Sequence, residues 1–122
     1  MRVFITGGTG FIGSAVVREL IDAGHTVTGL ARSEQAAAKL AAAGAGIHPG
    51  SLDDLDSLRS GAAAAEGVIH LAFNNDFVNY ARAVAADLRA VEAIGTVLIG
   101  SGKPFIIASG TLRVASLGRV AT

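Results

Sequence analysis

A glycine-rich segment near the N-terminus constrains most strongly what this chain can fold into. The segment reads Thr6-Gly7-Gly8-Thr9-Gly10-Phe11-Ile12-Gly13. It follows the β-branched and aromatic run at residues 2–6, which predicts a strand. Apolar residues then recur at three- and four-residue spacing over residues 11–23, which predicts a helix with one buried face that ends at Gly24. A strand, a glycine turn and a helix in this order are typical of the first βαβ unit of a parallel sheet.

The glycines of this segment have a physical purpose if the turn binds a dinucleotide. A pyrophosphate binds unpaired backbone N–H groups at a helix N-terminus, where the positive end of the helix dipole also lies. We expect Gly7 to permit the tight turn, Gly10 to remove the Cβ that would face the phosphates, and Gly13 to let the helix pack closely on the strand. The alternative is a glycine turn that merely connects strand and helix. The other cofactor contacts predicted in this loop are Thr9, Phe11 and Ile12.

Short apolar runs alternate with longer helical stretches over the rest of the chain. Further strands are predicted at residues 26–31, 45–48, 67–72 and 105–108. Helices are predicted from the N-cap Ser33 to about residue 43, over residues 53–60, and from residue 75 to about residue 100. Right-handed crossovers then give a doubly wound parallel α/β sheet in the strand order 3-2-1-4-5 with helices on both faces. We expect one Rossmann-type domain over residues 1–122, truncated after the fifth strand, with the C-terminal part of the fold missing.

Composition excludes several classes of partner. The 10 basic and 10 acidic residues cancel, so neither a nucleic acid nor a membrane surface is an expected partner. The chain has no cysteine, its first residues contain no apolar run long enough for a signal peptide, and no run approaches the roughly 20 apolar residues that span a bilayer. These features predict a cytoplasmic location. No histidine or carboxylate spacing predicts a metal site, and we interpret His70 as a packed residue, and His25 and His48 as surface residues.

The spacing Gly7-x-x-Gly10-x-x-Gly13 resembles that of the extended and atypical short-chain dehydrogenases/reductases, which include NAD-dependent epimerases, dehydratases and dihydroflavonol-type reductases. The resemblance covers essentially the whole chain. Gly50-Ser51-Leu52-Asp53-Asp54 is similar to the family's adenine-side motif, although Ser51 stands where an aspartate is usual. Val68-Ile69-His70-Leu71-Ala72 is similar to the family's fourth strand, whose C-terminal end runs past the ribose and phosphates. The cofactor contacts that the resemblance implies here are Ser51, Leu52, Leu71, Ala72 and Phe73.

The end of the second strand predicts which dinucleotide binds. In NAD-binding units an acid about 20 residues beyond the glycines accepts hydrogen bonds from the ribose 2′-hydroxyl and repels a 2′-phosphate. Here Arg32 and Ser33 follow the strand, and Glu34 is better explained as a carboxylate at a helix N-terminus. The resemblance places at Arg32 the arginine that binds the 2′-phosphate, a dianion that a guanidinium suits. We expect NADP, with NAD second and Ser33 as a further contact, while a solvated surface arginine is the alternative for Arg32.

The sequence lacks the catalytic pair that the resemblance implies. Short-chain reductases transfer a hydride between nicotinamide and a carbon that bears oxygen, and a Tyr-x-x-x-Lys pair moves the proton. Tyr80 is the only tyrosine, and Val84 occupies the fourth position after it, so we interpret Tyr80 as a core or interface aromatic. The segment at residues 106–111 looks like the family's substrate-binding Ser/Thr segment. This makes Ser109 the first catalytic candidate and Thr111 the reserve.

Two functions of different classes follow from these observations. The first is an NADP-dependent reductase or epimerase-like oxidoreductase that acts, when complete, on a small-molecule carbonyl or hydroxyl substrate. The second is a non-catalytic NADP-sensing module, which the missing Tyr-x-x-x-Lys pair favours. A purely structural domain with no ligand conflicts with the presence of Gly7, Gly10 and Gly13. Related proteins often pair through helices that include the one predicted over residues 75–100, so a homodimer through this helix is a further expectation.

Overall fold

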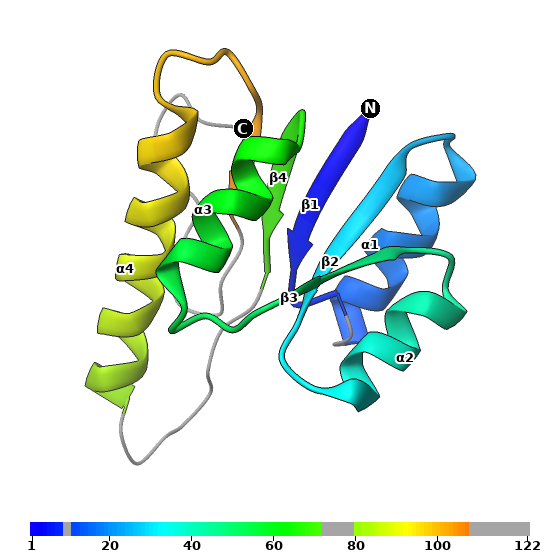
Figure 1. Cartoon of the computed structure of the whole chain (residues 1–122), viewed down its shortest axis with the longest axis horizontal. Coiled ribbons are helices and arrows are strands. Elements are labelled where there is room, and N and C mark those ends of the chain that lie inside the picture. The colour runs from blue at the N-terminus through cyan, green and yellow to red at the C-terminus, as the bar shows by residue number, and fades with distance from the viewer. Residues whose placement is uncertain (9–10, 72–79, 108–122) are drawn as a thin grey trace.

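Strands and helices alternate along a computed structural model that describes residues 1–8, 11–71 and 80–107, without the side chains of residues 11–12 and 80–84 (Figure 1). The elements in chain order are β1 (Arg2–Thr6), α1 (Phe11–Asp22), β2 (Thr26–Ala31), α2 (Glu34–Ala42), β3 (Gly46–Pro49), α3 (Leu55–Ala64), β4 (Gly67–His70), α4 (Tyr80–Leu98) and β5 (Phe105–Ile107). None of the helices in these described ranges is both long enough and apolar enough to cross a membrane.

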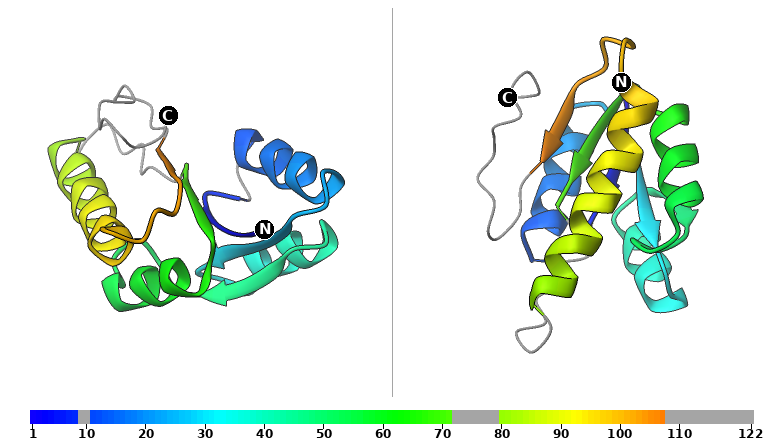
Figure 2. Two further views of the ribbon diagram at one scale, coloured as in Figure 1. Left: turned by 90° about the horizontal axis from the view of Figure 1, so that it is seen from above. Right: turned by 90° about the vertical axis from the view of Figure 1, so that its left-hand side faces the viewer.

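The strands form one parallel sheet in the order β3-β2-β1-β4-β5. This confirms the predicted α/β fold and its strand order. The chain winds outward from β1 to β3, returns across the sheet to β4 and then continues to β5. As a result, α1 and α2 cover one face and α3 and α4 cover the other (Figures 1 and 2). Since all strands run the same way, their carboxyl ends lie at one edge of the sheet.

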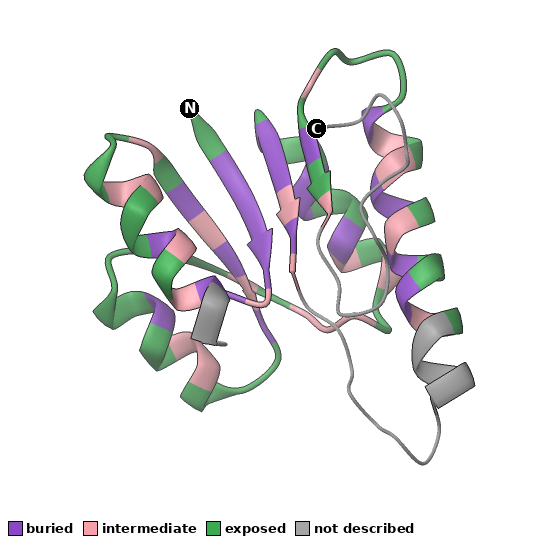
Figure 3. Cartoon of the chain, turned by 180° about the vertical axis from the view of Figure 1, so that it is seen from behind, coloured by how far each residue is buried: buried purple, intermediate pink, exposed green. Residues whose placement is uncertain are grey.

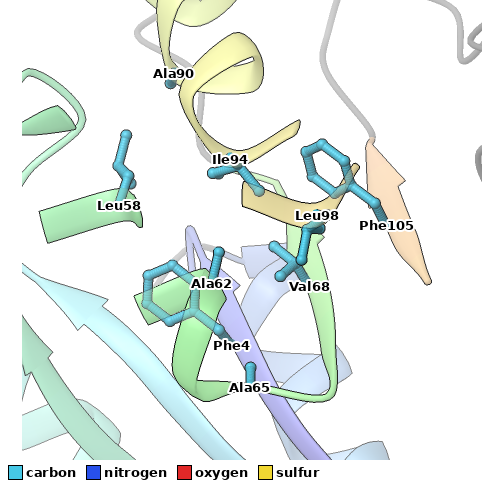
Figure 4. Close-up of a cluster of buried hydrophobic side chains, with 9 residues drawn as sticks. All are labelled: Phe4, Leu58, Ala62, Ala65, Val68, Ala90, Ile94, Leu98 and Phe105. Carbon is cyan, nitrogen blue, oxygen red and sulfur yellow. The ribbon is translucent and has the colours of Figure 1, made fainter. Parts of the chain in front are cut away.

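Two hydrophobic clusters hold the helices to the sheet, because consecutive side chains of a strand point to opposite faces. Phe4 of β1 packs with Leu58 of α3 and Ile94 of α4 (Figure 4). The next residue, Ile5, packs on the other face with Val17 of α1 and Leu40 of α2 in a second cluster. Figure 3 shows the resulting pattern, with buried residues along the central strands β1 and β4.

Helix ends follow the sequence signals closely in α1 and α2. Gly24 has a φ of 95° after α1, and its N–H donates to the carbonyl of Ile21 at 3.0 Å, so this glycine ends the helix as predicted. The N-cap Ser33 is also confirmed, because its side chain accepts a hydrogen bond from the N–H of Ala36 at 3.1 Å.

The helix α3 is longer than the predicted span of residues 53–60. Asp54 is its N-cap, and its carboxylate accepts a hydrogen bond from the N–H of Ser57 at 3.1 Å. The helix continues to Ala64 because alanine is the best helix former. Gly61 does not interrupt it, because this residue packs directly against the ring of Phe4. A Cβ at Gly61 would lie 2.5 Å from Cζ of Phe4. This glycine therefore lets α3 approach the sheet instead of ending the helix.

The surface interpretation of His25 and His48 is wrong, since both residues are half-buried. The ring of His48 meets the ring of Phe4 edge-on at a centroid distance of 5.3 Å, and its Nε2 donates to the carbonyl of Ser57 at 2.8 Å. Nδ1 of His25 is buried without a hydrogen-bond partner in the described part of the chain. The hydrogen bond from His48 to Ser57 therefore connects β3 with α3.

Candidate functional site

The segments that follow the first four strands gather at the carboxyl edge of the sheet. Thr6 at the end of β1 is paired with His70 at the end of β4, and Ala31 at the end of β2 is paired with Pro49 at the end of β3. In open α/β sheets, ligands bind outside this edge at the point where the strand order reverses. Here that point lies between β1 and β4.

The glycine turn after β1 packs so closely against α1 that position 13 of the helix has no room for a side chain. Gly7 has a φ of 78°, a left-handed conformation that favours glycine. A Cβ at Gly13 would lie 1.8 Å from the carbonyl oxygen of Gly7 and 2.7 Å from its carbonyl carbon. The close approach that Gly13 permits is thus to the backbone of the turn, one residue beyond the strand. This contact fixes α1 against the turn.

Leu40 of α2 packs against the same turn. Leu40 is fully buried, and its Cδ2 lies 3.2 Å from the position that a Cβ on Gly8 would occupy. A Cβ on Gly29, in the middle of β2, would lie 2.6 Å from the same Leu40 methyl. We did not predict this contact, although an isolated glycine inside a strand pattern is a signal of close approach.

Three of the residues predicted to contact the cofactor meet in one open hollow at the ends of β2 and β3. The hollow has a volume of about 570 Å³, and its lining includes Arg32, Ser33 and Ser51. Glu34 and Asp54 also line it, so one basic and two acidic residues contribute to the lining. Glu34 lies in the first turn of α2, as the sequence predicts. Its position in the lining of the hollow was not predicted.

Hydrogen bonds tie the rim of this hollow to the sheet. The N–H of Gly50 donates to the carbonyl of Ala31 at 3.0 Å, which joins the ends of β3 and β2. The hydroxyl of Ser57 on α3 donates to the carbonyl of Pro49 at 2.8 Å. The rim therefore includes backbone segments that are held in place from both sides.

The remaining predicted contact residues that the structure describes lie elsewhere. Leu52 is half-buried and packs against the cluster around Phe4, so its side chain belongs to the core. Leu71 directly follows β4, and its N–H donates to the carbonyl of Thr6 at 3.1 Å. Phe11 and Ile12 form the start of α1, but the structure does not describe their side chains. The predicted residues that lie outside the described ranges are Thr9, Gly10, Ala72, Phe73, Ser109 and Thr111.

A buried polar chain beside the glycine turn was missed by the sequence analysis. Oγ1 of Thr6 lies 2.7 Å from Nδ1 of His70, and Nε2 of His70 lies 2.8 Å from Oδ1 of Asp87 on α4. Thr6 and His70 are fully buried and Asp87 is 3 % exposed. A signal was present, because Asp87 stands at helical spacing with the buried residues Ala90 and Ile94, on the apolar stripe of α4. Among the described residues, no group of His, Asp or Glu side chains is arranged to hold a metal ion.

Residues 3–101 match the NAD dependent epimerase/dehydratase family. The chain is 52% identical over 122 residues to the Schizosaccharomyces pombe protein C2A9.02, covering 100% of this chain and 41% of that protein. It is also 35% identical over 96 residues to a 4-hydroxy-2-methyl-3-oxo-4-farnesyl-3,4-dihydroquinoline-1-oxide ketoreductase of Stigmatella aurantiaca, covering 79% of this chain and 28% of that enzyme. The chain thus spans less than half the length of either relative.

Solved structures of similar fold include proteins with either dinucleotide. UDP-glucose 4-epimerase of Thermotoga maritima, solved with UDP-glucose, has a TM-score of 0.71 and 26% identity over 88% of this chain and 37% of that enzyme. A short-chain dehydrogenase/reductase superfamily protein of Agrobacterium tumefaciens with bound NAD has a TM-score of 0.71 and 25% identity over 89% and 32% of the two chains. The complex of AtPrR2 with NADP+ and (+)pinoresinol has a TM-score of 0.67 and 28% identity over 85% and 35%.

Proposed function

This chain belongs to the NAD dependent epimerase/dehydratase family, and on that premise we propose that it binds NADP as the cofactor-binding part of an oxidoreductase acting on a carbonyl or hydroxyl substrate. The observation that carries the proposal is the meeting of Arg32, Ser33 and Ser51 in one hollow. This hollow lies at the same edge of the sheet as the glycine turn, so one extended dinucleotide has a site for its adenosine end and a site for its pyrophosphate.

The close packing at Gly13 and the charge at the start of α1 support pyrophosphate binding at the glycine turn. Gly13 brings the start of α1 against the carbonyl of Gly7, with no space for a side chain between them. The first turn of α1 contains no acidic residue, so no carboxylate within that turn opposes the positive end of the helix dipole. The backbone N–H groups at this helix start are the donors that would bind the phosphates.

The hollow fits a 2′-phosphate through Arg32 and the start of α2. The guanidinium of Arg32 offers forked, charge-assisted hydrogen bonds to a phosphate, and the N-terminus of α2 adds its dipole. Glu34 opposes a dianion in the same space, because like charges repel. The proposed preference for NADP is therefore the balance between the attraction by Arg32 and the repulsion by Glu34.

The remaining parts of the proposal concern chemistry and assembly. Ser109 and Thr111 follow β5, whose carboxyl end lies at the same edge of the sheet, and we propose them as contacts to the substrate oxygen. Bound NADP would supply the hydride chemistry, while this chain would bind and orient the dinucleotide.

We further propose a cytoplasmic location and a homodimer formed through α4, where Leu88 is 52% exposed.

Arg32→Ala is the direct test of the phosphate contact. The purified protein is titrated with NADPH and with NADH, and binding is followed by nicotinamide fluorescence or by heat. Loss of a charged hydrogen-bond donor is expected to weaken NADPH binding by about 1.5–3 kcal/mol, or roughly 10- to 150-fold, while NADH binding changes little. Arg59→Ala is the matched control, because Arg59 is a partly exposed arginine on α3 that pairs with Asp56 outside the hollow. Equal binding of both cofactors, unchanged by Arg32→Ala, would contradict the NADP assignment.

Ser33→Asp separates cofactor charge from helix capping. Aspartate is as good an N-cap as serine, so α2 and the thermal stability should be preserved. The new carboxylate lies in the hollow and is expected to weaken NADPH binding about tenfold or more relative to NADH. Ser33→Asn is the uncharged control with nearly the same shape and the same capping ability. An equal loss of NADPH binding in both variants would show that side-chain size, rather than charge, decides binding there.

A further inference from the structure

A chain of three buried polar side chains connects α4 with the carboxyl ends of β1 and β4. It begins at Asp87 on α4, passes through the ring of His70 on β4 and ends at the hydroxyl of Thr6 on β1. All three residues lie in the core, where a polar group is retained at a cost unless its hydrogen bonds are complete. The rest of the proposed function does not use these groups.

The hydrogen-bond pattern assigns a direction to this chain. The carboxylate of Asp87 can only accept, so Nε2 of His70 carries the proton that it donates. In the neutral ring with its proton on Nε2, Nδ1 is the acceptor for the Thr6 hydroxyl. The side-chain oxygen Oγ1 of Thr6 in turn accepts a hydrogen bond from the N–H of Leu71 at 3.2 Å. Asp87 thus sets the orientation of the ring, and the ring sets the orientation of the Thr6 hydroxyl.

Packing alone does not explain an aspartate at this position of α4. The neighbouring positions on the same stripe, Ala90 and Ile94, are buried apolar residues, and an apolar residue at position 87 would continue the stripe without a desolvation cost. The carboxylate instead fixes which ring nitrogen of His70 carries the proton. The hydrogen bonds oriented in this way reach the residue that precedes the glycine turn. Thr6 immediately precedes Gly7, whose φ of 78° opens the turn, and Leu71 begins the segment that follows β4.

We propose that His70 and Asp87 are positioning residues for the bound dinucleotide. They fix the Thr6 hydroxyl between β1 and β4 and thereby hold the start of the glycine turn at the place where the strand order reverses. This inference rests on the proposed function, since it assigns these residues to the same cofactor site. It separates two ends of that site: the pyrophosphate end depends on the polar chain, and the adenosine end in the hollow does not.

The test compares two ligands on the purified protein. NADPH needs both the glycine turn and the hollow, whereas adenosine 2′-monophosphate needs only the hollow. Thr6→Val removes the hydroxyl with little change of shape, and we expect it to weaken NADPH binding about 5- to 10-fold while adenosine 2′-monophosphate binds as before. Thr6→Ser restores the hydroxyl and should restore NADPH affinity. Asp87→Asn removes the charge that directs the ring and should reproduce the loss seen in Thr6→Val.

Each outcome has a separate meaning. Unchanged NADPH affinity in both Thr6→Val and Asp87→Asn overturns the inference while leaving the proposed cofactor site standing. Equal losses for both ligands also overturn it, because they indicate a general loss of folded protein. If the unmodified protein binds neither ligand, the proposed function itself fails and the inference fails with it. Recovery in Thr6→Ser distinguishes positioning by the hydroxyl from mere packing at this residue.

Discussion

Gly13→Ala is expected to abolish measurable NADPH binding and to destabilise the fold. The added Cβ would lie 1.8 Å from the carbonyl oxygen of Gly7 and 3.0 Å from Cα of Gly8. These are backbone atoms, so neither neighbour can rotate away, and α1 and the turn must move apart. Such overpacking destabilises proteins by about 1–3 kcal/mol. A displaced turn would also lose several backbone contacts to phosphate at about 1.5–3 kcal/mol each, which predicts at least a roughly 100-fold loss of affinity.

Gly95→Ala is the matched control for this variant. Gly95 is also a glycine inside a helix, but, apart from the adjacent backbone of α4, a Cβ built there meets no heavy atom of the described residues within 4 Å. Since alanine is favoured over glycine in a helix by about 1 kcal/mol, this variant should be slightly stabilised and should bind NADPH normally. Thermal unfolding and NADPH titration of both variants give the comparison. Normal binding by Gly13→Ala would mean that the turn does not cradle the pyrophosphate.

The order of the strands could be predicted because it depends on patterns that lie within short stretches of sequence. Each strand has a run of apolar residues, each is followed by a turn signal, and the crossover rule leaves few arrangements. The same logic brought Arg32 and Ser51 to one edge of the sheet, since each follows a parallel strand. Element ends were predicted less well where tertiary contacts decide them, as at Gly61, which continues α3 by packing on Phe4.

The contacts between distant side chains could not be predicted from the patterns alone. Thr6 and His70 are 64 residues apart, and only the register of β1 against β4 makes them neighbours. Asp87 joins them because α4 packs over the same pair of strands. The apolar stripe of α4 marked Asp87 as unusual, but its partner depends on how the helix is placed. The same is true of Glu34, whose sequence position explained a helix N-terminus and not its place in the hollow.

His70→Leu is expected to cause the largest loss of stability among single substitutions at the polar chain. Leucine fills a similar volume but leaves the carboxylate of Asp87, which is 3 % exposed, without its donor. Leaving a buried carboxylate without its hydrogen-bond donor is expected to lower the free energy of unfolding by about 3 kcal/mol or more. His48→Leu is the matched control, because His48 is half-buried and donates to a neutral carbonyl. Its loss should be only about 0.5–1.5 kcal/mol, measured for both by urea unfolding.

The double variant His70→Leu/Asp87→Leu separates the stability of the fold from the positioning of the turn. With both polar partners replaced, no buried carboxylate is left without a hydrogen-bond donor, and the free energy of unfolding should recover most of the loss seen in His70→Leu. The Thr6 hydroxyl, however, loses the ring that directs it, so NADPH affinity should stay low in a protein that is again stable. Full recovery of both quantities would assign the chain to folding alone. Additive losses of stability would show instead that His70 and Asp87 are not energetically coupled, in spite of their 2.8 Å contact.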